Sequence, residues 1–349
     1  MSVPNSTQQP DPSRIMQIGM GFWASKLLLV AIKFELFTLL ASQKSGAGAI
    51  KEKLGLRTTD QHVFDFLDGL VSLGFLEREG ILEKAIYSNS PDSNIFLDKK
   101  KPSYSGGILE MANNRLYEFW GHLEQGLLTG EAQNETKGAG NMNFFEDLYK
   151  SPEKLREFMN AMSAIQAGNF ISLVRQFPFS NYSSLVDVGG ADASFSIQVA
   201  AKHPRMHCIS FDLPAVEPLA KAKIRQAGLE DRISFSGGDF FKDPIPRGEV
   251  ISMGNILHGC NEEIKLQLIQ RVFEALPGNG VFIAIENIID DERRKNTFGM
   301  LMSLNMLIEN GDGFDYTFRQ FESWVKKAGF KKAEIIPLTG PTSAAIAYK

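Results

Sequence analysis

The spacing of apolar residues follows two patterns along the chain, and the change between them falls close to residue 180. Before that point the apolar positions recur at helical intervals; beyond it, short apolar runs alternate with helical stretches. The most apolar helical segment runs from Ile15 to Leu40, which predicts a helix buried in the core or against a second copy. Because Lys26, Lys33 and Glu35 interrupt it, the segment lacks the roughly 20 uninterrupted apolar residues of a membrane span.

Two short helical patterns and a pair of strands follow this apolar segment. The first helix lies in "GAGAIKEKLGL" and the second in "TTDQHVFDFLDGLVSLGFL", where Thr58 or Thr59 supplies the N-terminal cap. The next stretch, "EREGILEKAIYSNSP", contains two short strands about Gly80. Helix, turn, helix and hairpin in this order predict a winged-helix module, a fold that often places its second helix in a DNA groove.

The charges of that second helix argue against a nucleic-acid partner. It carries Asp60, Asp65 and Asp68, and no Lys or Arg occurs from Thr58 to Leu76. Such a helix would be repelled by phosphates. The formal net charge of the chain, −4, gives no general basic field either. We therefore expect neither nucleic acid nor an anionic membrane surface as a partner.

The second half of the chain predicts an α/β domain with a mainly parallel sheet. The segment "FPFSNYSS", from Phe177 to Ser184, has the proline and polar residues of a connection into it. The predicted strands are 184–188, 207–212, 233–237, 250–253 and 280–286. The last residues, 331–349, predict an antiparallel hairpin at the edge of the sheet.

The cysteine content and the first residues bear on the compartment. Only Cys208 and Cys260 occur, too few for a disulfide framework or a thiolate metal site, which suits a reducing compartment. The start of the chain, "MSVPNSTQQPDP", is polar and has no basic cluster, so it predicts a disordered tail and no signal peptide. We expect a cytoplasmic protein without a bound metal.

A stretch of glycines and acids in the second half predicts a nucleoside site. Asp187, Gly189 and Gly190 end one predicted strand, and Asp212 ends the next, where it can accept hydrogen bonds from ribose hydroxyls. Asp239, beside Phe240, follows a third strand and is a candidate for the adenine amino group.

The glycine turn is not a dinucleotide fingerprint. It reads Gly-Gly-Ala-Asp-Ala and not G-x-G-x-x-G, and Asp192 at the mouth of the following helix disfavours a pyrophosphate and is compatible with a cationic ligand.

At this point the sequence resembles a known family, the S-adenosylmethionine-dependent O-methyltransferases of the dimeric plant and bacterial type that includes hydroxyindole and caffeate methylating enzymes. "LVDVGG", "FDLPAV", "GDFF", "ILHGCNEE" and "LPGNGVFIAIENIIDD" occur in the family's order.

The resemblance implies three segments: a disordered tail, residues 1–13, a helical winged-helix dimerisation and substrate-lid domain, 14–177, and a seven-stranded Rossmann-like catalytic domain, 178–349. It also implies a homodimer, a small-molecule acceptor, S-adenosylmethionine as donor and S-adenosylhomocysteine as product. The donor contacts implied are Asp187, Gly189, Gly190, Asp212, Leu213, Asp239, Phe240, Met253 and Asn255.

Methyl transfer to a hydroxyl requires a base, because a phenol with a pKa of about 10 is a poor nucleophile at neutral pH. His258 follows a predicted strand and matches the histidine of the family's Leu-His-Asp-Trp motif, so it is the candidate base. The resemblance gives Glu286 as the acid that orients the imidazole and Asp315 as a second acid, of which Glu286 is favoured. The remaining histidines have helical or surface contexts and suggest no role in catalysis: His62, His122, His203 and His207.

The acceptor pocket is the part that the sequence specifies least. The helical segment 297–310 carries Met300, Met302 and Met306 in the region where the family builds this pocket. An apolar pocket with few polar groups suits a flat aromatic or heteroaromatic acceptor. The candidate lining residues are Asn113, Asn114, Trp120, Met159, Met162, Met302 and Met306.

Two departures from the family keep alternatives open. Ala191 and Ala193 stand at the third and fifth positions of the glycine motif, and Gly259-Cys260 replaces Asp-Trp after His258. The first alternative to an active O-methyltransferase is a protein of this fold that binds the donor but catalyses another reaction or none. The second is a winged-helix regulator with a ligand-sensing domain. The methylated atom, oxygen or nitrogen, also stays open.

Overall fold

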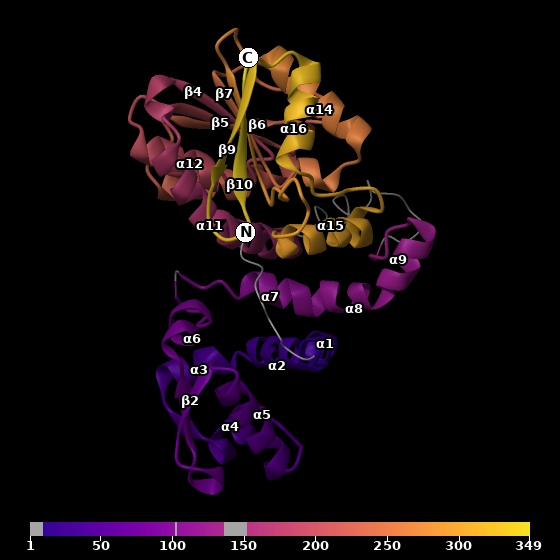
Figure 1. Cartoon of the computed structure of the whole chain (residues 1–349). Helices are drawn as coiled ribbons and strands as arrows, with labels where there is room; N and C mark the ends of the chain where they lie inside the picture. The colour runs from indigo at the N-terminus through magenta and orange to yellow at the C-terminus, as the bar shows by residue number, and fades with distance from the viewer. Residues whose placement is uncertain (1–9, 102, 136–151) are drawn as a thin grey trace, which may run out of the picture. The chain divides into compact units, whose positions relative to one another are not determined.

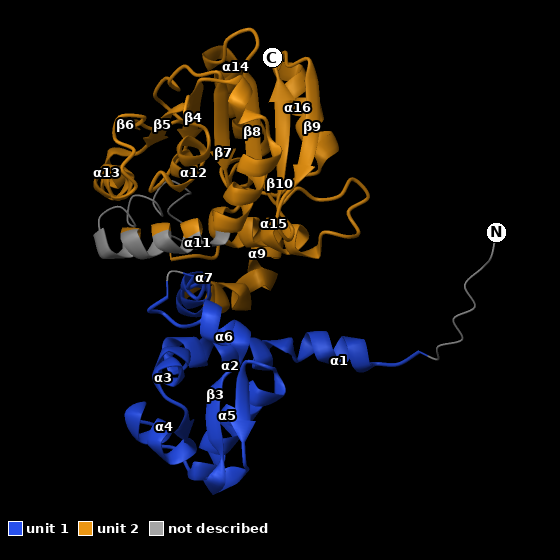
Figure 2. Ribbon diagram, turned by 90° about the vertical axis from the view of Figure 1, so that its left-hand side faces the viewer, with its two compact units in different colours: residues 1–114 blue, residues 115–349 orange. Residues whose placement is uncertain are grey.

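The structure, a computed structural model, describes residues 10–101, 103–135 and 152–349 (Figure 1). It divides into two compact units, Met1–Asn114 and Arg115–Lys349 (Figure 2). Residues 1–9 of the predicted tail lie outside the described residues, and the tail's last residue, Ser13, already begins a helix.

The first unit begins with three consecutive helices, where the sequence predicted one from Ile15 to Leu40. They are α1 (Ser13–Gly19), α2 (Gly21–Lys33) and α3 (Leu36–Ser42). The single-helix prediction is wrong because Met20 leaves the helical region and Glu35 has a φ of 53°, in the left-handed region, so the axis breaks twice.

The segment Ser13–Lys33 is long and apolar enough, by length and composition alone, to cross a membrane. Only 17% of its most apolar window is buried within the chain. Ile15, Ile18 and Trp23 are among its exposed side chains, at 74%, 75% and 63%. An apolar helix surface of this kind is typical of a contact with another molecule.

The rest of the first unit follows the predicted order of helix, turn, helix and hairpin. Thr59 is the cap of the second helix, since its side chain accepts from the His62 amide at 3.3 Å. Gly80 turns the hairpin with a φ of 78°. The three-stranded antiparallel sheet has the order β1-β3-β2. The elements are β1 (Ser45–Gly46), α4 (Ala47–Lys53), α5 (Asp60–Ser72), β2 (Leu76–Glu79), η1 (Leu82–Lys84), β3 (Ile86–Asn89), α6 (Pro91–Phe96) and α7 (Gly107–Met111).

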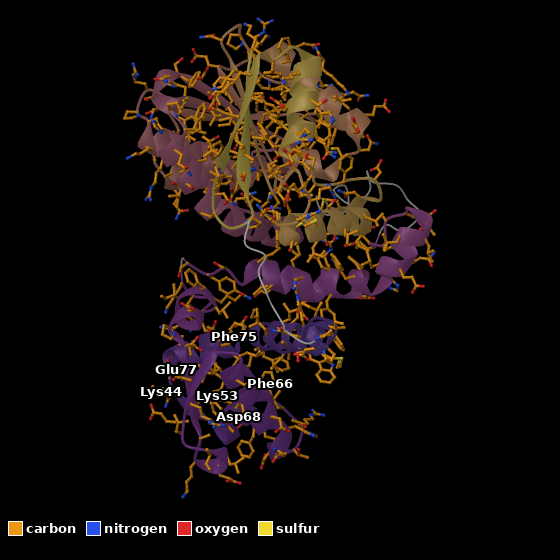
Figure 3. The ribbon with its side chains drawn as sticks, in the orientation of Figure 1. Lys44, Lys53, Phe66, Asp68, Phe75 and Glu77 are labelled. Atoms are coloured by element: carbon orange, nitrogen blue, oxygen red, sulfur yellow. The ribbon has the colours of Figure 1, made fainter. Side chains whose placement is uncertain are left out.

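The acids on α5 have partners within the chain. Asp68 (Figure 3) forms an ion pair with Arg78 at 2.7 Å and accepts from the Tyr87 hydroxyl at 2.9 Å. Asp60 is paired with Lys51 at 2.6 Å. These contacts attach the helix to its neighbours, and Arg78 and Lys51 offset part of its negative charge.

The second unit starts at Arg115 and includes α11 (Pro152–Gln176), which packs against α12 (Ser194–Lys202) of the α/β layer. A π-helical turn, η2 (Ala112–Leu116), spans the division between the units. The other helices before the sheet are α8 (Tyr117–Phe119), η3 (Trp120–His122), α9 (Leu123–Thr129) and η4 (Phe179–Asn181).

A seven-stranded sheet forms the centre of the second unit, in the order β6-β5-β4-β7-β8-β10-β9 (Figure 2). Strands β4 to β8 pair in parallel, and β10 is antiparallel to both of its neighbours. This confirms the predicted Rossmann-like α/β domain and its terminal hairpin. The strands are β4 (Ser184–Val188), β5 (His207–Asp212), β6 (Ile233–Gly237), β7 (Val250–Gly254), β8 (Val281–Glu286), β9 (Lys332–Pro337) and β10 (Ser343–Tyr348).

Helices cover both faces of this sheet and create one apolar cluster on each. The inner strands β4, β7, β8 and β10 are buried on both faces and read in the sequence as nearly continuous apolar runs, whereas the edge strands β6 and β9 are partly exposed. Because β4, β5, β7 and β8 are parallel, the loops that follow them meet at the carboxyl edge of the sheet. The remaining helices are η5 (Pro214–Val216), α13 (Glu217–Gln226), η6 (Leu257–Gly259), α14 (Glu262–Ala275), α15 (Thr297–Asn310) and α16 (Phe318–Ala328).

Candidate active site

The turn after β4 is shaped by left-handed backbone conformations. Gly189, Ala191 and Ala193 have φ values of 66°, 49° and 63°. A Cβ on Gly190 would lie 2.4 Å from the Ser210 hydroxyl oxygen, so no side chain fits there. The turn therefore keeps the conformation that a glycine motif specifies, although two of its positions are alanine.

The alanines hold this conformation at a cost. A left-handed residue with a Cβ is less stable than a right-handed one by roughly 1–2 kcal/mol. Ala193, which precedes α12, is fully buried in the apolar cluster on that face of the sheet. Its methyl group thus contributes packing that glycine would lack.

Two buried carboxylates stand beside this turn without a cation. Asp212 accepts from the Ala191 amide at 2.8 Å and from the Leu213 amide at 2.7 Å, and Asp187 accepts from the Ser252 hydroxyl at 2.8 Å. Neither carboxylate has a basic partner among the described residues. Burial raises the pKa of Asp187 to about 7 and that of Asp212 to about 6, although these hydrogen bonds act in the opposite direction.

Asp192, which the sequence suggested as a counter-charge for a cationic ligand, already has a cation. Its carboxylate lies 2.5 Å from Lys223 Nζ and accepts from the Ser163 and Ser194 hydroxyls. The expectation for Asp192 is therefore corrected: its charge is balanced within the chain, whereas those of Asp187 and Asp212 are not.

The adenine-side candidates lie on the loop after β6. Asp239 accepts from the Phe241 amide at 2.9 Å and is 3.1 Å from Lys242 Nζ. Phe240 is half-buried, and its ring lies 3.8 Å from the Cβ position of Gly189. The loop thus brings an aromatic face to the glycine turn.

The other donor-side candidates differ in accessibility. Leu213 and Asn255 are half-buried at strand ends, and Asn255 has a φ of 52°. Met253 is completely buried within β7, in the apolar cluster, which leaves it a supporting position in this structure.

The geometry of the candidate base reverses the predicted order of the two acids. Asp315 faces the imidazole of His258, with 3.5 Å between its Oδ2 and Nδ1. Glu286 Oε1 instead accepts from the backbone amides of Ile256, at 3.0 Å, and His258, at 3.2 Å. Glu286 therefore holds the loop and Asp315 faces the ring, whereas the sequence favoured Glu286 for the ring.

All three side chains are buried, which makes their charges interact strongly. Burial acts to lower the pKa of His258, but Asp315 and Glu286 outweigh it and raise the pKa above its usual value. Burial also raises the pKa of Glu286. Nε2 of His258 has no hydrogen-bond partner within the part of the chain that the structure describes. One side of the ring therefore faces the Asp315 carboxylate, 3.5 Å away, and the other side faces no polar group of the described residues.

The acceptor candidates are distributed over several elements. In the second unit, Trp120 Nε1 donates to Asn305 on α15 at 2.8 Å. The sulfur of Met306 accepts from Asn310, which in turn donates to the carbonyl of Gly259 beside the candidate base. Helix α15 therefore joins Trp120 to the His258 loop.

The other acceptor candidates are less closely connected. Met159 packs with Leu155 and Val216 against Ala191, and so lies beside the glycine turn. Met162, Met300 and Met302 are half-buried. Asn113 and Asn114 belong to the first unit, where Asn113 accepts from Lys26 at 2.8 Å.

Sequence reasoning missed several groups around this edge. Ser252 binds Asp187, Gly313 packs its backbone on the loop of His258, and Lys265 is wholly buried nearby. A lysine on an amphipathic helix is normally a surface residue, so nothing in the local pattern distinguished Lys265.

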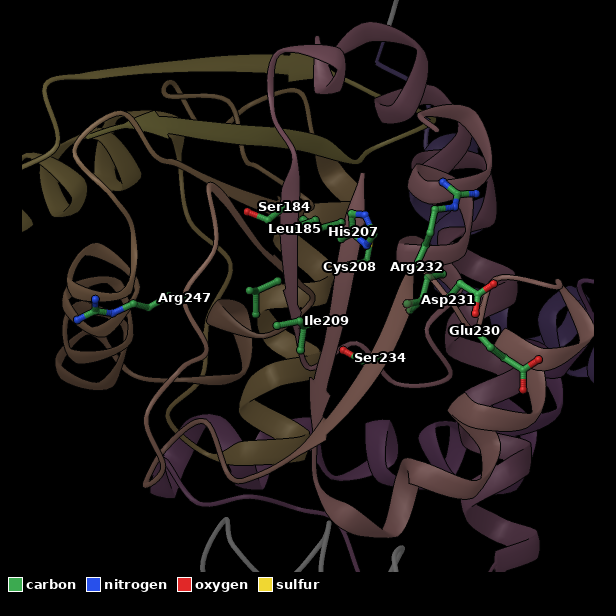
Figure 4. Close-up of a pocket in the computed structure, with 12 residues that line it drawn as sticks. Ser184, Leu185, His207, Cys208, Ile209, Glu230, Asp231, Arg232, Ser234 and Arg247 are labelled. Carbon is green, nitrogen blue, oxygen red and sulfur yellow. The ribbon is translucent and has the colours of Figure 1, made fainter. Parts of the chain in front are cut away.

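A cavity of about 190 Å³ lies at the opposite, amino ends of the strands, away from these groups. Figure 4 shows Ser184, His207 and Arg232 among its lining residues. The Arg232 guanidinium already donates to the backbone carbonyls of Ala200, His203 and Pro204. The cavity therefore brings no further catalytic group to the site.

The carboxyl edge fits an adenosyl sulfonium ligand. The buried carboxyl groups of Asp187 and Asp212 offer acceptors to hydroxyl or ammonium groups, and a cationic ligand would stabilise their ionised forms, whose pKa burial raises. Among the described residues, no group of three or more His, Cys, Asp or Glu side chains is arranged to bind a metal ion.

Comparison with family profiles matches most of the chain. Residues 120–331 match the profile described as an O-methyltransferase domain, and residues 16–99 match the O-methyltransferase dimerisation domain.

Individual relatives cover nearly the whole chain. The tetracenomycin polyketide synthesis 8-O-methyl transferase TcmO of Streptomyces glaucescens is 37% identical over 97% of both sequences. The N,N-dimethyltransferase OxyT of Streptomyces rimosus is 31% identical over 91% of this chain and 90% of its own. The crystal structure of human N-acetylserotonin methyltransferase in complex with S-adenosylmethionine superposes with a TM-score of 0.88, at 26% identity and 99% coverage of both chains.

Proposed function

The chain belongs to the family of S-adenosylmethionine-dependent O-methyltransferases, and we propose that it methylates a hydroxyl group of a small aromatic or heteroaromatic molecule with His258 as the general base. The observation that carries the proposal is the buried imidazole on the same sheet edge as Asp212: its Nδ1 lies 3.5 Å from Asp315 Oδ2, and its Nε2 has no partner among the described residues.

In this proposal the donor would supply a methyl group bonded to a positively charged sulfur: the acceptor oxygen bonds to the methyl carbon while the carbon–sulfur bond breaks, and neutral S-adenosylhomocysteine leaves. The chain's part is to align the two molecules and to remove a proton. Asp212 would accept hydrogen bonds from the ribose hydroxyls of the donor, and Asp239 and Phe240 would lie on its adenine side. The negative charges of Asp187 and Asp212 favour a cationic ligand at this edge.

His258 Nε2 takes the hydroxyl proton of the acceptor. Asp315 keeps the N–H on Nδ1 and stabilises the imidazolium that forms. Glu286 holds the loop through two backbone amides, so it sets the position of the ring without touching it. The three residues thus divide proton removal, orientation and loop support among them.

The acceptor class rests on the relatives. TcmO acts in tetracenomycin polyketide synthesis, so a polycyclic phenol is the first acceptor to test, and the pathway would be secondary metabolism. The similarity to OxyT, an N,N-dimethyltransferase, makes amines the necessary second panel. Trp120, Met302 and Met306 are proposed to line the aromatic part of the pocket, together with Met159 and Met162 of the same unit.

The assembly proposed is a cytoplasmic homodimer without nucleic-acid or membrane partners, in which a winged-helix domain carries the dimer contact. The match of residues 16–99 to a dimerisation domain and the exposed apolar surface of α1 and α2 support it. The acids of α5 disfavour a DNA-binding role.

The departures from the family do not remove the donor site in this proposal. Ala191 and Ala193 keep the left-handed conformations of the turn, and the Ala191 amide still donates to Asp212. This favours an active methyltransferase over a protein of the same fold that has lost methylation.

The test compares His258→Ala with the wild type on a neutral phenol and on a nitrophenol that is already ionised. The variant should bind donor normally and methylate the neutral phenol ~10²–10⁴-fold more slowly, the usual contribution of a positioned base. The rate of methylation of the ionised acceptor should fall much less, because its proton is already gone. His207→Ala, an exposed histidine at the start of β5, is the matched control. Equal losses with both acceptors would show that His258 positions the substrate and is not the base.

A further inference from the structure

Lys265, on α14, is a charged side chain that the proposed reaction leaves without a role. The residue has no exposed surface, and its Nζ donates to the carbonyl oxygen of Cys260. The same nitrogen lies 3.3 Å from the centroid of the Phe314 ring, 5.9 Å from that of Tyr316 and 5.8 Å from that of Trp324. Lys265 therefore occupies an aromatic cage closed by one backbone carbonyl.

A buried cation is expensive unless its surroundings stabilise it. Three aromatic faces and one carbonyl do so here, because the ring quadrupoles attract positive charge. Burial nevertheless lowers the pKa of Lys265 to about 8, against the opposing effect of Glu286. The neighbouring inward positions on α14, Leu268 and Ile269, are ordinary core residues, so the helix could pack with an apolar side chain at 265 as well. Packing of α14 alone therefore does not account for a charged side chain at 265, whereas its contacts with Cys260 and Phe314 do.

Lys265 contacts the loop that carries His258 and also the loop that carries Asp315. Cys260 is two positions after His258, whereas Phe314 and Tyr316 flank Asp315. The lysine thus joins the loop of the base to the loop of its acid.

Other contacts connect the same two loops. Asn261 donates to Asp312 at 2.7 Å, and Asn310 donates to the Gly259 carbonyl at 3.1 Å. A Cβ on Gly313 would lie 2.9 Å from the carbonyl carbon and oxygen of Gly259, so the backbones are in close contact. Among these connections, Lys265 supplies the buried positive charge.

We propose that Lys265 is a positioning residue of the methyl transfer, which holds the His258 loop against the Asp315 loop through its bond to Cys260 and its contact with Phe314. It rests on the proposed function, because it acts through the base assigned there. In the absence of Lys265, the imidazole still occupies the site but its alignment with Asp315 is lost.

Lys265→Met separates positioning from plain packing. Methionine has a similar length and fits an aromatic cage, but it carries neither charge nor donor. Replacing a buried charge by an apolar side chain of similar volume is often neutral or stabilising, so the variant should keep the wild-type Tm. Its kcat for a neutral phenol should fall about 10- to 100-fold, the scale of a misaligned catalytic group, with the donor Kd unchanged. Lys265→Arg, which keeps the cation and a donor, should recover most of the rate.

Leu268→Ala is the matched control on the same helix, since Leu268 is buried in the same apolar cluster. It should lower the Tm by leaving a cavity but keep kcat. The two variants thus give opposite results, which a purely structural role of Lys265 would not produce.

A double mutant decides whether Lys265 acts through the base. In the His258→Ala background, Lys265→Met should cause no further loss, because there is no imidazole left to align. If Lys265→Met lowers kcat by the same factor in the His258→Ala background as in the wild type, the positioning role is overturned. The same holds if Lys265→Met keeps the wild-type kcat while His258→Ala is impaired; in both cases the base assignment stands. A wild-type rate for His258→Ala would instead overturn the base assignment, and with it the role proposed for Lys265.

Discussion

Replacing Gly313 by alanine tests whether backbone contact between two loops sets the catalytic geometry. The Cβ of the new residue would lie 2.9 Å from the His258 carbonyl oxygen and from the carbonyl carbon and oxygen of Gly259. All of these atoms belong to the backbone, so no side chain can rotate away. Gly313 has no left-handed φ, which means that alanine adds no dihedral strain of its own.

The size of the effect follows from the contact distances. Carbon atoms in a packed interior are separated by about 3.5–4.0 Å, so the loops must move apart by roughly 0.5 Å or more. Overpacking of this kind typically costs about 1–3 kcal/mol. The same movement lengthens the 3.5 Å separation between His258 and Asp315, for which we expect a loss of roughly tenfold or more in kcat.

The assay is a pair of measurements on each purified variant, the Tm by calorimetry and kcat with a neutral phenol. For a unit of this size, each kcal/mol lowers the Tm by about 2–4 °C. Gly278→Ala is the control, because Gly278 is exposed in the loop before β8, has no left-handed φ and has nothing within 4 Å of its Cβ position. If Gly313→Ala matches this control in both Tm and kcat, the loops are not held by their backbones and the reasoning is refuted.

Three further predictions follow from the carboxylates and from the first unit. Asp212→Ala should weaken S-adenosylhomocysteine binding by ~1–3 kcal/mol in calorimetry, the scale for hydrogen bonds to a charged acceptor, and an unchanged affinity would remove Asp212 from the site. Burial raises the pKa of Asp187 from 3.8 to about 7, so the folded state retains a proton that the unfolded chain releases and stability falls as the pH rises between these values. Asp187→Asn should flatten this fall in thermal unfolding of the ligand-free protein from pH ~5 to ~7.5, and identical slopes would contradict it. Light scattering at micromolar concentration should give the mass of a dimer, and a monomer would count against α1 and α2 as the contact.

The α/β domain could be predicted almost to the residue, because its short apolar runs alternate with helical stretches and have clear ends. The predicted ranges 184–188, 207–212 and 233–237 are those of β4, β5 and β6. Each of these strands ends at, or just before, a glycine or an aspartate, namely Gly189, Asp212 and Gly237, which leaves little choice of boundary. The break at Glu35 could not be predicted, because a left-handed φ is uncommon for a glutamate and has no signal in the local pattern.

The candidate site was predicted in its members but not in its contacts. His258, Glu286 and Asp315 do come together, yet which acid faces the ring depends on how two loops pack. That packing rests on Gly313 and Lys265, residues whose roles arise from contacts between distant segments. Spacing along the chain places a residue at a sheet edge, but it does not determine the direction of its side chain.

The two alanines in the turn after β4 bear on how such a motif changes during evolution. At Ala193 the left-handed strain of roughly 1–2 kcal/mol is offset by about 0.8 kcal/mol for the buried methyl and by about 0.4–1 kcal/mol for the smaller entropy of the unfolded chain. The sum is close to zero, so an exchange between glycine and alanine here is nearly neutral to selection on stability. Lineages can therefore drift between the two residues while the shape that faces the ligand persists, and a search for the glycines alone would overlook chains that keep the turn.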